Sequence, residues 1–143
     1  MRRLDHASIF VLIAGTYTPI ALLGLPNGGG SLLWYAWGGA LLGVLSSVFW
    51  TSAPKWVLAA MCVAVGWTLT PYLGDLYRSL DGKAFALVML GGAPYTLGAL
   101  AYAAKRPNPV PSVFGYHEVF HALTLVGATL HFAAVMRLVE LAR

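Results

Sequence analysis

Hydrophobic residues in this chain fall into five long runs, separated by short segments rich in glycine, proline or charge. A helix needs about 20 predominantly apolar residues to cross the hydrocarbon core of a bilayer. The runs cover residues 7–25, 32–50, 56–74, 84–104 and 117–136. We therefore predict an all-α fold, a polytopic transmembrane helical bundle with five spans in one domain of residues 1–143.

Composition supports the membrane assignment. The chain is 59% hydrophobic and 10% charged, whereas roughly a quarter of the residues in a soluble domain are charged. Its one cysteine, Cys62, cannot form an intrachain disulfide, so cysteine usage leaves the redox compartment open. The basic start is interrupted by Asp5 and His6 and has no clear cleavage site, so we do not interpret it as a signal peptide.

Basic residues give an orientation rather than a nucleic-acid site, because they are scattered at the ends of the runs. The C-terminal tail aside, one face carries Arg2, Arg3, Lys55, Lys105 and Arg106, and the other carries Arg78 and Lys83. Cytoplasmic loops hold the excess of Lys and Arg. We therefore expect an integral protein of a bacterial inner membrane, with the lipid bilayer as its partner and its N-terminus in the cytoplasm.

Helix-breaking and small residues inside the runs predict the shape of the bundle. Each internal proline removes a helical hydrogen bond and can kink its helix, and nearby threonines can satisfy the freed carbonyls. The prolines are Pro19, Pro71 and Pro94, and the threonines are Thr18, Thr70 and Thr96. The pairs Gly38-Gly39 and Gly91-Gly92 predict close contacts between helices.

The last run contains three of the four histidines. Polar side chains are costly in a span and mark candidate sites. On a helix, positions 117, 121, 124, 128 and 131 form one stripe, which we expect to face other helices or a polar cavity. His117 and His121 lie one turn apart and can bind one metal ion. His131 is about 15 Å further along the helix, so we expect it to be a buried imidazole bonded to a neighbouring helix.

The string His117-Glu118-x-x-His121 also matches the zinc metalloprotease motif, in which the glutamate is the general base. No third ligand follows at a familiar spacing. A carboxylate in the first turn of a helix is favoured by the helix dipole. We prefer this structural role for Glu118.

Asp5 precedes the first run by two residues and lies at the same predicted membrane face as His117 and His121. Its carboxylate suits either a helix N-terminus or a metal site, and these roles are compatible. His6 points about 100° away from Asp5 on a helix and is a weaker candidate. Two histidines and one aspartate leave zinc an open position for water, as hydrolysis requires, and the carboxylate can accept the proton of that water.

At these residues the sequence resembles the hemolysin III family, within the wider progestin and adipoQ receptor superfamily. The matching segments are residues 3–6 and 13–19, then 117–121 with Gly127 and 131–132. The resemblance implies zinc near the cytoplasmic face, with His117 and His121 as ligands and Asp5 reaching the ion through a water. Relatives among the adiponectin receptors resemble ceramide hydrolases. On this likeness the protease-like string is a coincidence of ligand spacing, and Glu118 has no catalytic role.

The family has seven spans, and the five runs correspond to its spans three to seven. The first two spans have no counterpart here, and the histidine that completes the zinc site is among the residues they carry. We therefore expect a partial site in a truncated product, a fragment or a chain with a mis-assigned start, unless waters or a second subunit fill the gap. An uncovered polar stripe favours a homo-oligomer or instability.

Four functions compete. The first is a zinc-dependent, ceramidase-like hydrolase of lipid amides, with His117, His121 and Asp5 at the metal and Asp5 also in catalysis. The second is a non-enzymatic protein of membrane homeostasis or cytolysis, in which the histidines hold structural zinc or are relics. The third is an intramembrane metalloprotease that uses Glu118. A haem-binding bundle ranks last, because haem needs histidines on facing helices.

Overall fold

The computed structural model describes residues 2–27, 29–50, 52–110 and 112–143, with side chains from Asp5 onward. The helices are α1 (Arg2–Gly24), α2 (Gly30–Phe49), α3 (Lys55–Gly66), the 3₁₀ helix η1 (Trp67–Tyr72), α4 (Leu73–Ser79), α5 (Gly82–Ala104) and α6 (Tyr116–Leu141). Over the described residues there is no strand, only an isolated bridge between Val110 and Phe114 in the α5–α6 loop. The all-α prediction is confirmed.

Five helical segments are long and apolar enough to cross a membrane: Asp5–Gly24, Gly30–Phe49, Lys55–Ser79, Gly82–Ala104 and Tyr116–Leu141. The prediction of five spans is confirmed, but two boundaries differ. Residues 75–79, expected in a charged loop, form most of α4, and residues 137–141, expected beyond the last span, continue α6. Long charged side chains at the end of a span can reach water along the helix surface. Charge alone therefore does not end these helices.

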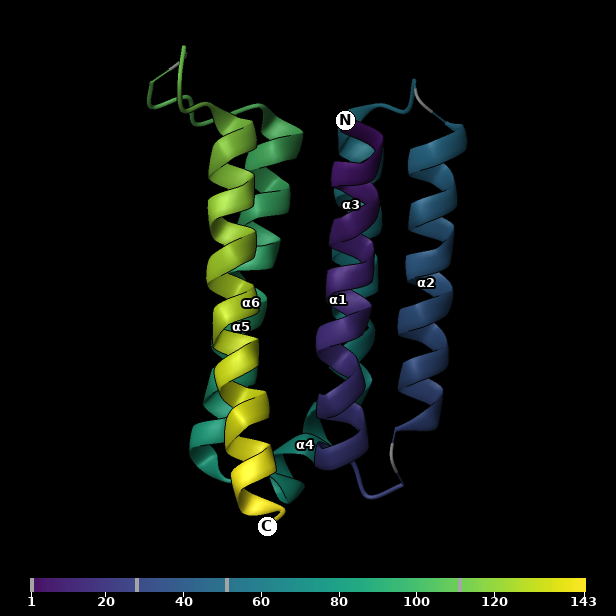
Figure 1. Cartoon of the computed structure of the whole chain (residues 1–143), viewed down its shortest axis with the longest axis vertical. Coiled ribbons are helices and arrows are strands. Elements are labelled where there is room, and N and C mark those ends of the chain that lie inside the picture. The colour runs from purple at the N-terminus through teal and green to yellow at the C-terminus, as the bar shows by residue number, and fades with distance from the viewer. Residues whose placement is uncertain (1, 28, 51, 111) are drawn as a thin grey trace.

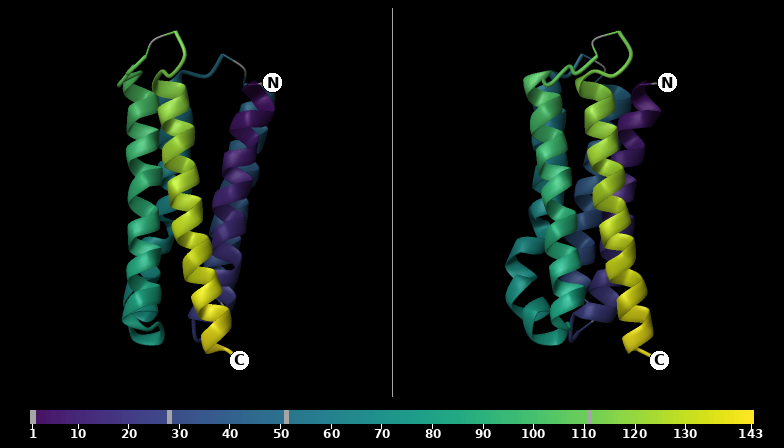
Figure 2. Two further views of the ribbon diagram at one scale, coloured as in Figure 1. Left: turned by 60° about the vertical axis from the view of Figure 1, so that its left-hand side comes forward. Right: turned by 90° about the vertical axis from the view of Figure 1, so that its left-hand side faces the viewer.

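The spans stand side by side as a bundle (Figure 1). Helices α1 and α2 form one antiparallel pair, α5 and α6 form another, and α3 lies behind α1 in this view. The turned views and the helix contacts place α6 against both α5 and α1 (Figure 2). Because the spans alternate in direction, the N-terminus, the start of α3, the end of α5 and the start of α6 share one end of the bundle. The C-terminus lies at the opposite end.

Helix α1 is the central element. In its most apolar window 44% of the residues are buried, against 22–28% in the other four spans. Phe10 and Ile20 of α1 are fully buried. Aromatic residues of α2 instead face outward: Trp34 is 82% exposed and Tyr35 is 64% exposed, as expected for side chains that lie against lipid or its headgroups.

The prolines are accommodated in two ways. Pro71 lies in η1, where the third span narrows to a 3₁₀ helix. Pro19 lies inside the continuous helix α1, where it leaves the carbonyl of Gly15 without its usual donor. The hydroxyl of Thr18 donates instead to the carbonyl of Ala14, at 3.0 Å. The prediction that a threonine would satisfy the freed carbonyl is therefore wrong at Pro19.

A polar clamp joins α5 to α6 at the end of the bundle that holds the C-terminus. Asp81 Oδ1 accepts a hydrogen bond from the Ala84 backbone N–H at 3.0 Å, and its Oδ2 accepts from Arg137 Nη2 at 3.1 Å. The Ala84 N–H and, after it, the Arg137 guanidinium lower the pKa of Asp81, because both stabilise the ionised carboxylate. This clamp fixes the start of α5 against the last turns of α6.

Candidate metal centre

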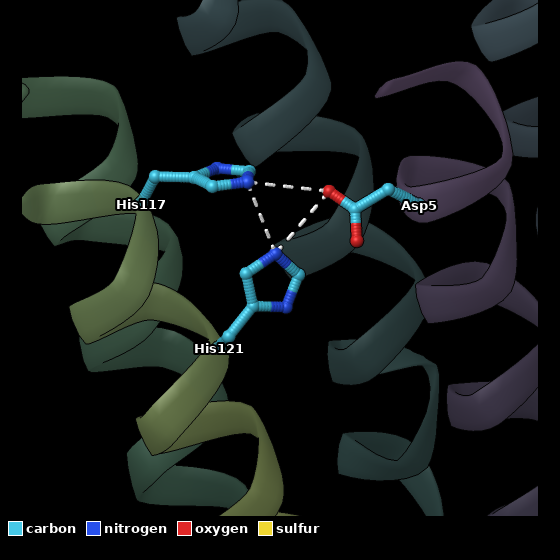
Figure 3. A group of neighbouring side chains, drawn as sticks. All are labelled: Asp5, His117 and His121. Atoms are coloured by element: carbon cyan, nitrogen blue, oxygen red, sulfur yellow. Dashed lines mark hydrogen bonds and ion pairs between the residues drawn. The ribbon is translucent and has the colours of Figure 1, made fainter. Parts of the chain in front are cut away.

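Helices α1 and α6 bring three ligand-type side chains together at the end of the bundle that holds the N-terminus. Asp5 lies in the first turn of α1, and His117 and His121 lie in the first two turns of α6. Because four residues are close to one helical turn, both imidazoles leave α6 on the same side. All three side chains point toward one another across the space between the helices (Figure 3).

The three ligand atoms form a nearly regular triangle. Asp5 Oδ2 lies 3.2 Å from His121 Nε2 and 3.4 Å from His117 Nε2, and the two Nε2 atoms are 3.3 Å apart. Two atoms bound to zinc at about 2.0–2.1 Å, with a tetrahedral angle between them, are about 3.3 Å apart. The triangle therefore fits one face of a tetrahedral zinc site and leaves the fourth position open.

The chemistry of these groups also favours a cation. Two Nε2 atoms that face each other at 3.3 Å repel unless a proton or a metal ion lies between them. The carboxylate of Asp5 adds negative charge at the same point, and nitrogen and oxygen donors together suit zinc. The side chains are 30% exposed for Asp5, 35% for His117 and 33% for His121. The centre is therefore open to water.

Two neighbouring polar residues stay outside this triangle. The side chain of Glu118 turns back toward the start of α6, where Oε2 accepts a hydrogen bond from the Gly115 backbone N–H at 2.9 Å. This is the structural role predicted for a carboxylate in the first helical turn. His6 Nε2 is hydrogen-bonded to Tyr102 Oη of α5 at 2.8 Å, in agreement with its predicted direction away from Asp5.

His131 lies deep in the bundle, far along α6 from the triangle. It is 1% exposed, and its Nε2 is 3.1 Å from the carbonyl oxygen of Val88 on α5. The prediction of a buried imidazole bonded to a neighbouring helix is confirmed.

A cation beside the centre was missed in the sequence. Lys55 Nζ, at the start of α3, donates to Tyr116 Oη and lies 4.4 Å from the Tyr116 ring centroid and 5.6 Å from that of Tyr102. The alternation of spans already places Lys55 at this face, and Tyr116 directly precedes His117, so both could have been found. Tyr102 lies within an apolar run, and only the packing of α5 brings it here.

The chain is similar in sequence to known proteins. Residues 1–132 match the family described as haemolysin-III related. The hemolysin-3 homolog of Bacillus subtilis (strain 168) is 35% identical over 135 residues, which cover 93% of this chain and 60% of that protein. Hemolysin-3 of Bacillus cereus is 32% identical over 136 residues, which cover 93% of this chain and 58% of that protein. No solved structure shows significant similarity.

The chain thus spans about 60% of the length of the curated relatives it matches. Within that length, the family match covers four of the five spans completely and most of α6. It includes the segments that carry Asp5, His117 and His121. This integral membrane protein therefore belongs to the haemolysin-III related family.

Proposed function

We propose that the chain is a zinc-dependent membrane hydrolase of lipid amides, with His117, His121 and Asp5 at the metal. One observation carries the proposal: the two Nε2 atoms and Asp5 Oδ2 lie 3.2–3.4 Å from one another. Two histidines and one carboxylate, with one position left open, form the ligand set of several zinc hydrolases. The zinc expected from the family resemblance supports the choice of metal.

The three residues have different roles at such a centre. A bound zinc ion supplies Lewis acidity, which activates water and polarises a carbonyl. His117 and His121 hold the ion from one helix, so their spacing is fixed by α6. Asp5 faces them through Oδ2, and a carboxylate has a second oxygen that can accept a proton from water. Asp5 is therefore both a ligand and the proposed proton acceptor.

The position of the centre supports a lipid substrate. It lies in the first turns of two spans, near one membrane face, where the amide of a membrane lipid would also lie. We place this face on the cytoplasmic side of a bacterial inner membrane, from the distribution of basic residues. A water would fill the open position, as hydrolysis requires.

The relatives are named hemolysin-3 and a hemolysin-3 homolog, and these names favour a second candidate. This is a non-enzymatic role in membrane homeostasis or cytolysis, in which the same residues hold a structural ion. A protease that uses Glu118 has less support, because this carboxylate bonds to Gly115 at the start of its own helix.

The metal content of the purified, detergent-solubilised chain tests the proposal. We expect about one zinc per chain, lost in the His117→Ala/His121→Ala double variant and retained in His6→Ala. The zinc-loaded protein should then release fatty acid from a short-chain fluorescent ceramide. Zinc without hydrolysis would leave the second candidate, and a folded wild-type chain that binds no zinc would contradict both.

A further inference from the structure

A cavity of about 520 Å³ lies inside the bundle, bounded by α1, α3, η1, α5 and α6. Its size is that of a ligand pocket, for which about 300–1,000 Å³ is usual. Most of its lining is apolar, and several lining residues of η1 and α5 also face outward. Trp67 is 58% exposed, Met89 44% and Leu97 56%. The cavity therefore opens sideways between the third span and α5, toward the lipid.

Two polar atoms in this lining have no hydrogen-bond partner in the described part of the chain: Tyr95 Oη and His131 Nδ1. His131 is 1% exposed, and the two ring centroids are 5.5 Å apart. A buried polar atom without a partner is costly, most of all in a membrane. The pair therefore marks the point in the lining where a hydrogen-bonding partner is missing.

The protonation of His131 defines that group. Its Nε2 is 3.1 Å from the carbonyl oxygen of Val88, and a carbonyl only accepts, so Nε2 carries the proton. The Nδ1 atom of the neutral ring is then an acceptor, whereas Tyr95 Oη can donate. A group that donates to one atom and accepts from the other satisfies both, and a hydroxyl does so. A carboxylate has no proton to donate, and a phospholipid headgroup carries charge that this neutral pair does not balance.

Two glycines make room for the pair in the contact between α5 and α6. A Cβ atom on Gly91 of α5 would come within 2.2 Å of His131 Cδ2, and a Cβ on Gly127 of α6 would come within 2.8 Å of Tyr95 Cε2. Each helix thus leaves room for the polar ring of the other. Both rings are held in place by backbone packing, which gives the site a fixed shape.

We propose that this cavity binds a neutral, single-chain lipid that carries a hydroxyl group. The alkyl chain fills the apolar part, while the hydroxyl donates to His131 Nδ1 and accepts from Tyr95 Oη. The polar pair is separate from the metal centre, because His131 lies about 15 Å beyond His121 along α6. The apolar lining of the cavity extends as far as Phe120, next to His121. It requires no metal and does not depend on the hydrolase proposal.

Binding of two radiolabelled probes, hexadecanol and its methyl ether, to the purified chain tests this site. The ether accepts a hydrogen bond but cannot donate one, so the wild type should prefer the alcohol about tenfold. Tyr95→Phe removes only a hydroxyl and should weaken both probes about three- to tenfold while the preference remains. His131→Phe should abolish the preference. Tyr77→Phe, outside the cavity lining, is the matched control and should change neither affinity.

Equal affinity of the two probes for the wild type would overturn the proposal, as would unchanged affinity in Tyr95→Phe or no binding of either probe. In those cases the two polar atoms do not recognise a lipid hydroxyl. These comparisons decide the matter even if His131→Phe does not fold. Binding should survive chelation of zinc, so the result is independent of the test of the metal centre.

Discussion

The two helices that form the candidate metal centre each carry a carboxylate in the first turn. The structure gives these two carboxylates different roles. Asp5 Oδ2 lies within 3.4 Å of both histidines, whereas Glu118 Oε2 lies 2.9 Å from the Gly115 nitrogen. Glu118 is adjacent to His117 in sequence, but adjacent residues on a helix point about 100° apart. A residue on a facing helix can approach both imidazoles at once, and Asp5 does.

Replacing each carboxylate by its amide separates these roles with little change in volume. Asp5→Asn should weaken zinc binding at least about tenfold, because the ion loses a charged ligand. Glu118→Gln should leave zinc affinity unchanged, because its side chain lies outside the triangle. Competition with a chromogenic zinc chelator measures both affinities on the purified chain. A loss of zinc in Glu118→Gln would contradict the placement of this side chain outside the triangle. The metalloprotease arrangement predicts instead that Glu118→Gln keeps zinc and abolishes proteolysis, because its glutamate is the general base and not a ligand.

At the scale of helices, two glycine pairs, Gly38-Gly39 and Gly91-Gly92, were predicted to form close contacts. In each pair only one glycine lies against a neighbouring helix. An added Cβ would come within 2.8 Å of a neighbouring side chain at Gly39 and within 2.2 Å at Gly91. At Gly38 and Gly92 it would meet nothing within 4 Å. Adjacent positions on a helix differ by about 100°, so only one residue of each pair can face the partner helix.

This difference predicts opposite effects of two neighbouring substitutions in α5. Gly91→Ala should destabilise the protein by about 1–3 kcal/mol, because the methyl group displaces His131 from the α5–α6 contact. Gly92→Ala places its methyl group in open space and should be neutral or raise stability by up to about 1 kcal/mol through helix propensity. Thermal unfolding in detergent gives the order of the two Tm values. Equal Tm values would show that the α5–α6 contact adapts to the larger side chain.

The elements that sequence predicted best are those that need no knowledge of packing. Run length gave the five spans, and the alternation of spans brought Asp5 to the same end as His117. The predictions that failed, or were not made, depend on how the helices pack against one another. The hydroxyl of Thr18 donates to the carbonyl of Ala14, whereas the prediction required the carbonyl of Gly15, which Pro19 leaves without its donor. Tyr95 is one aromatic in an apolar run, and its unpartnered hydroxyl becomes evident only when α5 packs against α6.

At the scale of the whole molecule, the two ends of the bundle carry different sets of basic residues. The end with the N-terminus carries Lys55, Lys105 and Arg106, and the other end carries Arg78 and Lys83. Arg137 also lies at the second end, where its guanidinium pairs with Asp81 at 3.1 Å. With Arg2 and Arg3 at the start of α1 added to the first end, and Arg137 and Arg143 to the second, the first end has five basic residues against four. This excess favours the first end as the cytoplasmic one. This orientation would place the candidate metal centre in contact with the cytoplasm.

Labelling of single cysteines with a membrane-impermeant maleimide in intact bacterial cells tests the orientation. Ser79→Cys, at the end of α4, should be labelled in intact cells, and Asn108→Cys, in the α5–α6 loop, only after the membrane is broken. Both positions are exposed, and neither substitution changes the charge that sets the orientation. Cys62, the one native cysteine, is 8% exposed, so the unmodified chain is the control and should stay unlabelled. The reverse pattern would place the partly exposed centre on the outer face, and its substrate would then be a lipid of the outer leaflet.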